Sequence, residues 1–318
     1  MILRIKEKNI PVWSGLLIAV LLMLTMGMAF GGTSKAALKQ KTFSSAGEAV
    51  KAAVTAAKNN DDKELIALFG PSAKELIFSG DAVADKQRRE QFIRLYDEKY
   101  SLVPEKESMV IVIGKHDWPF PIPIAKKGDA WFFDTDKGKD EILNRRVGAN
   151  ELDTIQTMLA IVDAQREYAM FDRDNNGIND YAQNFRSDQG KNNGLYWKTK
   201  EGEDLSPLGE FMSGARFDEY AGTGAKQAPV PYHGYYFRIL RKQGGHAIGG
   251  KLEYLVKNKM IGGFAVVASP AKYGNSGVMT FIVNHDGIVY EKDLGKNTAK
   301  TVKAIKAFDP DKTWKELP

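Results

Sequence analysis

The 318-residue sequence contains no cysteine. Disulfide bonds, iron–sulfur clusters, thiolate nucleophiles and zinc–thiolate sites are therefore excluded. The lipid-modified cysteine of a bacterial lipoprotein is excluded as well. The folded chain must obtain its stability from buried hydrophobic cores, which a chain of this length can form.

Motifs that mark common enzyme classes are also missing. The sequence has no Gly-x-Ser-x-Gly turn, no phosphate-binding glycine loop and no dinucleotide fingerprint. Its 4 histidines include no His-x-x-x-His pair of the kind that binds zinc. His233 is a candidate general base, although packing at the start of a strand explains it equally well. We therefore name no catalytic residue and favour a non-enzymatic protein, while an enzyme stays open.

The N-terminal residues combine a basic start with an apolar run. Arg4, Lys6 and Lys8 precede residues 12–30, which carry no charge. This order is typical of an export signal, with cleavage expected after Ala29. Because the run is longer than the usual apolar part of a signal, an uncleaved inner-membrane anchor is the alternative. In both cases we expect the remaining chain in the periplasm or outside the cell, touching a membrane only through this segment.

Charge and composition describe a globular protein without a nucleic-acid surface. Hydrophobic residues make up 43% of the chain and charged residues 27%. The formal net charge is +5, of which +2 belongs to Arg4, Lys6 and Lys8 taken with Glu7, so +3 remains after removal of the leader. That excess is spread over a mixed surface, so we expect no nucleic-acid partner.

The residue pattern divides the chain into four segments and predicts an α+β fold. Residues 1–30 form the signal or anchor, 31–42 a linker, 43–136 a first domain and 137–318 a second domain. In the first domain, helical spacing is followed by short runs of period two, which predicts helices before a curved antiparallel sheet. In the second, a long amphipathic helix precedes four or five strands and is expected to pack on their antiparallel sheet.

Individual elements follow from local signals. Ser45, three residues before Glu48, forms a capping box at a helix start. Prolines at alternate positions from 119 to 123 predict an edge or extended segment instead of a central strand. The other expected helices cover residues 86–96, 150–170 and 298–308, and the expected strands cover 109–113, 122–125, 130–133, 235–240, 252–256, 264–269, 278–283 and 288–291.

The strongest helical pattern runs from Asp140 to Met170. Gly148 is expected to interrupt it, with Asn150 capping the second part. The predicted inward stripe of that second part has helical spacing and consists of Leu152, Ile155, Leu159 and Val162, flanked by Met158 and Ile161.

Five phrases of the sequence resemble a known family. They are Asp117-Trp118-Pro119-Phe120-Pro121, Ile142-Leu143-Asn144-Arg145-Arg146, Asp163-Ala164-Gln165-Arg166-Glu167-Tyr168, Pro231-Tyr232-His233-Gly234-Tyr235-Tyr236-Phe237, and Tyr273-Gly274-Asn275-Ser276-Gly277-Val278-Met279-Thr280-Phe281. Together they resemble the bacterial exported family called domain of unknown function 2950, over nearly all residues after 42. The resemblance implies export and carries no activity.

Two further resemblances concern folds. Residues 43–136 look like the cone-shaped nuclear transport factor 2-like fold, which commonly encloses a pocket. Residues 150–292 look like the globular part of pilin-like proteins, with a Gly-Tyr-x-Phe strand at 234–237. Because no prepilin cleavage site and no apolar helix half precede Asn150, assembly into a filament through a helical core is not expected.

An acidic loop is the candidate metal site. Oxygen ligands at alternating positions of a loop with a central glycine suit calcium, and three carboxylates predict weak binding. The expected ligands are Asp172, Asp174, Asn176, the Ile178 carbonyl and Asp180, with Gly177 permitting the turn. The loop departs from the EF-hand pattern because Gln183 replaces the final glutamate. The alternative is an Asx-rich turn in which Asp180 caps a helix over residues 181–185.

Aromatic residues beside carboxylates form a candidate ligand pocket. Asp117 and Trp118 lie in one segment, and Trp131 and Asp134 in another. Ring faces bind apolar patches while carboxylates accept hydroxyl hydrogen bonds, so the combination suits sugars or small polar ligands. A buried aromatic cluster with acidic turn ends is the alternative.

Two functions follow. The leading prediction is an exported, non-catalytic binding or assembly protein of the cell envelope, whose partner is an envelope protein. Its contact surface would be aromatic and would comprise Tyr196, Trp197, Phe211, Phe217 and Tyr220. The alternative is a small-molecule-binding protein or enzyme that uses a pocket in the first domain, although a fold alone never determines what a pocket does.

Overall fold

A computed structural model of the chain describes residues 39–318, except 174, 176, 201 and 210–229. The predicted signal or anchor at residues 1–30 lies outside the described residues. Residues Leu38–Pro318 form one compact unit. Within the described part, no helix is both long enough and apolar enough to span a bilayer.

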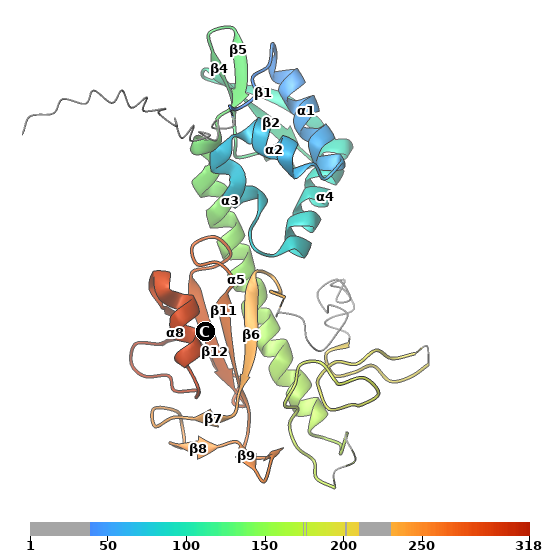
Figure 1. Cartoon of the computed structure of the whole chain (residues 1–318), viewed down its shortest axis with the longest axis vertical. Coiled ribbons are helices and arrows are strands. Elements are labelled where there is room, and N and C mark those ends of the chain that lie inside the picture. The colour runs from blue at the N-terminus through green and yellow to red at the C-terminus, as the bar shows by residue number, and fades with distance from the viewer. Residues whose placement is uncertain (1–38, 174, 176, 201, 210–229) are drawn as a thin grey trace, which may run out of the picture. The chain divides into compact units, whose positions relative to one another are not determined.

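Helices precede an antiparallel sheet in the first part of the unit (Figure 1). The sheet has the order β1-β2-β4-β5, and β3 pairs with β2. Its core contains Ile111, Ile113, Ile124 and Phe133 from the strands and apolar residues of α1 and α2. The elements are α1 (Ala46–Lys58), α2 (Asp62–Phe69), the 3-10 turn η1 (Pro71–Ala73), α3 (Lys74–Ile77), α4 (Ala82–Glu98), β1 (Tyr100–Glu105), β2 (Ser108–Ile113), β3 (Trp118–Pro119), β4 (Ile124–Lys127) and β5 (Ala130–Phe133).

Side-chain caps define where the first helices begin. The Ser45 hydroxyl accepts a hydrogen bond from the Glu48 amide at 3.2 Å, as the capping box predicts. The Glu48 carboxylate accepts from the amide and hydroxyl of Ser44 instead of the Ser45 amide. Asp61 caps α2 in the same way, through the Glu64 amide at 3.0 Å.

A long helix and a second antiparallel sheet form the rest of the unit (Figure 1). The helix α5 packs on strands β11, β12 and β13 of a sheet with the order β14-β13-β12-β11-β6. The elements are α5 (Thr135–Tyr168), β6 (Tyr235–Leu240), β7 (Lys242–Gln243), β8 (Leu252–Glu253), β9 (Leu255–Val256), β10 (Lys259–Met260), β11 (Ala265–Pro270), β12 (Met279–Asn284), β13 (Val289–Asp293), η2 (Gly295–Asn297), α8 (Thr298–Ala304) and β14 (Lys315–Glu316). The predicted α+β class, with a long helix on an antiparallel sheet, is confirmed.

The expected break at Gly148 is wrong, because α5 is continuous from Thr135 to Tyr168. A helical glycine costs only about 1 kcal/mol, and buried side chains hold the helix on both sides of Gly148. Asn150 is not a cap. Its amide oxygen accepts from Arg88 at 2.7 Å, and its amide nitrogen donates to the Ser276 carbonyl at 2.8 Å.

The predicted inward stripe of α5 is also wrong in part. Leu152 and Leu159 are 67% and 37% exposed, whereas Met158, Ile161 and Val162 are buried. Two threonines, at positions 154 and 157, occupy core-facing positions. Each hydroxyl donates to the backbone carbonyl four residues earlier, so it is buried without an unpaired donor. The buried face of α5 therefore includes polar residues and differs from the apolar stripe that the sequence pattern predicted.

One predicted strand is divided. Residues 252–256 form two short strands, since β8 pairs with β7 and β9 pairs with β10. Tyr254 between them is fully buried, and its hydroxyl donates to Gln243 at 2.8 Å. The chain therefore changes from pairing with β7 to pairing with β10 at Tyr254, whose side chain is buried in the core.

Buried polar groups connect the first helices with the second sheet. Asp81 caps α4 through the Ala84 amide and accepts from the Gly234 amide at 2.9 Å. Arg146 of α5 donates to the Asn275 side chain at 2.8 Å. The described residues of the single compact unit form two hydrophobic clusters, and the division into domains at residues 136 and 137 stays a prediction.

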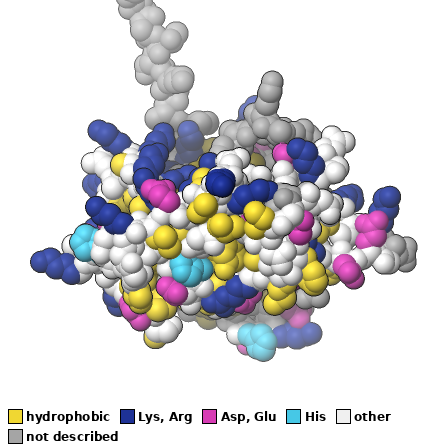
Figure 2. Space-filling model, turned by 90° about the horizontal axis from the view of Figure 1, so that it is seen from below, with side chains coloured by type: hydrophobic (Ala, Val, Ile, Leu, Met, Phe, Trp, Pro, Cys, Tyr) yellow, Lys and Arg dark blue, Asp and Glu magenta, His cyan; other side chains and the backbone are white. Residues whose placement is uncertain are grey.

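Large hydrophobic side chains are exposed near β7 to β10. Ile248 is 72% exposed, and Leu252, Val256 and Ile261 are each 45% exposed. Figure 2, seen from the end of the molecule where β7, β8 and β9 lie, shows hydrophobic side chains interspersed with basic and acidic ones. Single exposed hydrophobic residues in such a mixture are ordinary for a protein surface.

Alanine substitutions at two glycines of α5 test the helix. The one at Gly148 tests its continuity, and the one at Gly138 tests its close packing on Pro121 and Ile122. Gly148→Ala should raise the free energy of unfolding by about 1 kcal/mol, because a β-carbon there meets nothing within 4 Å. Gly138→Ala should lower it by about 1–3 kcal/mol, because the β-carbon would collide with the Pro121 carbonyl and lie 2.8 Å from Ile122 Cα. Urea unfolding of both variants checks this. A destabilised Gly148→Ala would contradict the continuous helix.

Candidate ligand cavity

A cavity of about 740 Å³ lies between the helices α1 to α4, the sheet and the first half of α5. Its volume lies in the roughly 300–1,000 Å³ range of small-molecule pockets. The extended segment that contains the alternating prolines forms part of its wall, through Phe120, Pro121 and Ile122. The Phe120 amide donates to the Ile111 carbonyl at 2.7 Å, which holds this segment against β2.

Most of the wall is apolar and aromatic. The period-two pattern of β2 directs Ile111 and Ile113 inward, where they are at most 1% exposed. The rings of Phe69 and Phe133 lie 4.4 Å apart between centroids, and those of Phe92 and Phe120 lie 5.4 Å apart. Such walls bind hydrocarbon by excluding water from it.

Three basic side chains of the cavity are paired with acids. Arg89 Nη1 lies 2.7 Å from Asp62, Lys115 Nζ 2.9 Å from Glu98, and Arg145 Nε 2.6 Å from Glu141. The Arg145 guanidinium also lies over the Trp118 ring, 5.2 Å from its centroid. These positive charges are therefore largely balanced at their own positions.

Arg88 and Asp85 form the fourth pair, at 3.4 Å. Asp85 is buried, and burial raises the pKa of its carboxyl above the ordinary value. Hydrogen bonds from Ser79 and the charges of Arg146 and Arg88 act in the opposite direction. The single carboxylate of Asp85 therefore balances the positive charges of Arg88 and Arg146 only in part.

Arg146 is the most buried basic group of the cavity, at 6% exposed. Its Nη1 donates to the Glu75 carbonyl at 2.9 Å and to Asn275, and its Nη2 donates to the Leu76 carbonyl. Its Nε has no hydrogen-bond partner. Burial, followed by the charge of Arg88, lowers the pKa of Arg146 to about 10, so it is protonated at neutral pH.

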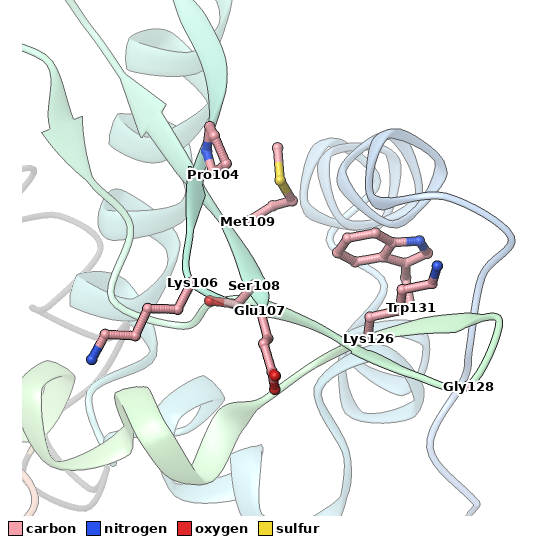
Figure 3. A pocket seen from close by; sticks show the side chains of 8 residues that line it. All are labelled: Pro104, Lys106, Glu107, Ser108, Met109, Lys126, Gly128 and Trp131. Carbon is pink, nitrogen blue, oxygen red and sulfur yellow. The ribbon is translucent and has the colours of Figure 1, made fainter.

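A second pocket, of about 380 Å³, lies at the turn between β1 and β2 and the hairpin of β4 and β5 (Figure 3). Trp131 lines it, with Lys126 Nζ 5.8 Å from the ring centroid. Figure 3 shows Lys106 and Glu107 pointing away from Trp131. Since its polar groups do not converge, this pocket fits a specific ligand less well than the larger cavity.

The four residues predicted to form a ligand pocket are not brought together around one cavity. Trp118 lines the larger cavity and Trp131 the smaller one. Asp117 pairs with Lys99 at 2.7 Å, and Asp134 with Lys137 at 3.0 Å, and neither carboxylate lines either cavity.

The acidic loop is only partly described. Asp174 and Asn176 lie outside the described residues. Asp172 Oδ2 accepts from the Gly177 amide at 2.8 Å, Ile178 is 44% exposed and Asp180 is buried. No helix forms over residues 181–185, so the capping part of the alternative interpretation is wrong. Among the described residues, no three His, Cys, Asp or Glu side chains cluster as metal ligands.

His233 lies apart from the cavity wall, at the connection with the second sheet. Its Nδ1 lies 3.1 Å from Asp153 Oδ2, and its backbone has φ of +49°. Burial lowers the pKa of His233 below the ordinary value, although Asp153 and Asp81 raise it in part. His116 is the histidine that lines the cavity, and it is exposed there.

Sequence reasoning missed the arginines of the cavity. Arg88 and Arg89 stand in α4, whose sequence is mostly polar, and Arg145 and Arg146 stand in the first half of α5, before the apolar stripe that the sequence pattern singled out. The one available signal was the adjacent pair Arg145-Arg146 in a phrase that carried the family resemblance. Nothing in the chain order indicated that α4 and α5 share a cavity.

Comparison with known proteins identifies a family and no function. The family model described as "Protein of unknown function (DUF2950)" matches residues 40–317, so the chain belongs to this family. Neither the curated proteins nor the solved structures contain a match.

The burial of His233 predicts a pH dependence of stability. Because its pKa is lowered on folding, the unfolded chain binds the proton more tightly, and stability falls as pH decreases through the unfolded value of about 6.5. His233→Asn keeps a residue that tolerates positive φ and should lose less stability between about pH 7 and pH 5 than the natural protein. Urea unfolding at several pH values checks this, and equal losses would contradict it.

The calcium prediction can be tested directly. Calorimetric titration of the chain should give a Kd of roughly 0.1–1 mM, and calcium should raise the melting temperature. Asp172→Ala removes a predicted ligand and should abolish both effects. Heat release that persists unchanged in this variant would place calcium elsewhere.

Proposed function

We propose that this member of the DUF2950 family is an exported, non-catalytic protein of the bacterial cell envelope that binds an apolar small molecule in the large cavity. The largely apolar cavity of about 740 Å³ lined by α1 to α5 and the sheet is the observation that carries the proposal. The basic start and apolar run of residues 1–30 support export to the periplasm or beyond, with inner-membrane anchoring if the segment is uncleaved.

The chemistry of the lining residues favours binding over catalysis. A hydrolytic or acid–base enzyme needs a nucleophile or base placed beside a second polar group that orients it. Among the described lining residues, Asp85 already accepts from the Ser79 amide and pairs with Arg88. The Arg and Lys side chains of the described lining are cations, which suit recognition of an anion.

The resemblance of residues 43–136 to the nuclear transport factor 2-like cone belongs to this proposal, since such cones commonly enclose a pocket. The pilin-like resemblance of residues 150–292 supports an assembly role instead. Tyr196 and Trp197, two of the aromatic residues predicted for assembly contacts, pack against the second core and are half-buried. Phe211, Phe217 and Tyr220 lie outside the described residues.

Exposed hydrophobic residues near β7 to β10 are the observation that favours assembly with an envelope partner. They are interspersed with charges (Figure 2), which is weaker support than a continuous apolar surface. We therefore place ligand binding first.

Ligand binding in the cavity is tested with a fluorescent probe and with a substitution that places a larger side chain at the cavity wall. Nile red, a neutral apolar fluorophore, should bind the natural protein with saturable fluorescence. Leu76→Trp adds an aromatic ring at the cavity wall and should weaken binding at least about 10-fold, which corresponds to 1.4 kcal/mol. Fluorescence titration measures both affinities.

Leu152→Trp is the matched control, because it makes the same substitution at a residue that is 67% exposed on α5. Its affinity for Nile red should equal that of the natural protein. Equal weakening by both substitutions, or no saturable binding at all, would contradict a ligand site in the cavity.

A further inference from the structure

The charges of the cavity are unequal in number. Of the described lining side chains, five are Arg or Lys, and one, Asp85, is acidic. Each of four basic groups has a carboxylate partner, taken from Asp85, Asp62, Glu98 and Glu141. The basic residues are Arg88, Arg89, Lys115, Arg145 and Arg146. The excess of one positive charge therefore belongs to Arg146.

Arg146 carries this positive charge in a buried position, where an unbalanced charge is most unfavourable. Among the described residues its guanidinium forms no ion pair of its own, because Asp85, whose charge also acts on it, is paired with Arg88. Its Nε is buried without a hydrogen-bond partner. Backbone carbonyls and the Asn275 amide oxygen accept its other hydrogen bonds, but these are neutral dipoles. A buried charge without a counter-ion is unfavourable, and an anion nearby would offset that cost.

The remaining walls exclude most anions. A small inorganic anion or a sugar acid would leave the surfaces of Phe92, Ile111 and Phe133 without contacts. A neutral hydrocarbon would fill these surfaces but leave Arg146 unbalanced, and an alkyl cation would be repelled. A ligand with both an apolar chain and one negative charge matches both features.

We infer that the cavity binds a single-chain amphiphile with an anionic head group, the chain against the aromatic wall and the head beside Arg88 and Arg146. The inference rests on the proposed function, because it names the ligand class of the same cavity. A carboxylate and a phosphate monoester share the chemistry that the arginines recognise, and both form charge-assisted hydrogen bonds with guanidinium groups.

Four probes with the same dodecyl chain test the head group. Laurate, dodecyl phosphate, dodecanol and dodecylamine are each titrated against Nile red bound to the full chain at neutral pH, below the micelle concentration or, for dodecanol, the solubility limit. The anions should bind at least about 10-fold more tightly than dodecanol, and dodecylamine most weakly. The order of laurate and dodecyl phosphate tells whether the head is a carboxylate or a phosphoryl group.

The outcomes separate the inference from the proposed function. Dodecanol that binds as tightly as laurate would overturn the anionic head group and leave the apolar cavity intact. Failure of all four probes to displace Nile red, or failure of Nile red to bind, would overturn the cavity as a ligand site.

A charge variant outside the cavity keeps the test independent of folding. Glu141 is 52% exposed and balances Arg145, so Glu141→Gln should tighten laurate several-fold and leave dodecanol unchanged. Glu167→Gln, on the same helix but paired with Arg173, changes the net charge equally and should have no effect. Equal effects of the two variants would show a non-specific response to net charge and contradict the inference.

Arg146 itself is tested by a pair of substitutions. Arg146→Gln should remove the preference of laurate over dodecanol, whereas Arg146→Lys, which retains the charge, should keep most of it. A folded Arg146→Gln protein that keeps the full preference would overturn the role of this residue.

Discussion

The buried guanidinium of Arg146 is the interaction on which the arrangement of the structure depends. It extends from α5 to the carbonyls of residues 75 and 76 in α3 and to Asn275 in the turn before β12. These groups belong to three separate parts of the chain. Because a buried charge needs polar partners, each of these segments must stay near α5, and the cavity takes its shape from that requirement.

The same residue connects the architecture with the proposed function. Its hydrogen bonds are made to neutral acceptors, so they hold the guanidinium in place without balancing its charge. Aromatic residues of α2, α4 and β5 line the same cavity. A structural arginine with residual charge, next to apolar walls, is the arrangement from which we propose an anionic amphiphile as the ligand.

Local signals predicted most elements well. The cap at Ser45, the strand at residues 235–240 and the helix start at residue 298 agree with the structure, because caps and short-range periodicity act within a few residues. The errors in α5 have one physical origin. Thr154 and Thr157 are buried by bonding to carbonyls of their own helix, and Gly148 is held helical by contacts on both sides, so packing overrode local preference.

The sequence by itself determined the α+β class, the family and the absence of thiol chemistry, since each depends on composition or on residues close together in the chain. It predicted no arginine of the cavity. Arg146 and Asn275 are 129 positions apart, and Arg88 and Asn150 are 62 apart. Only the tertiary structure decided which side chains share a cavity and which charge lacks a counter-ion, because both depend on distances between segments that periodicity and spacing do not encode.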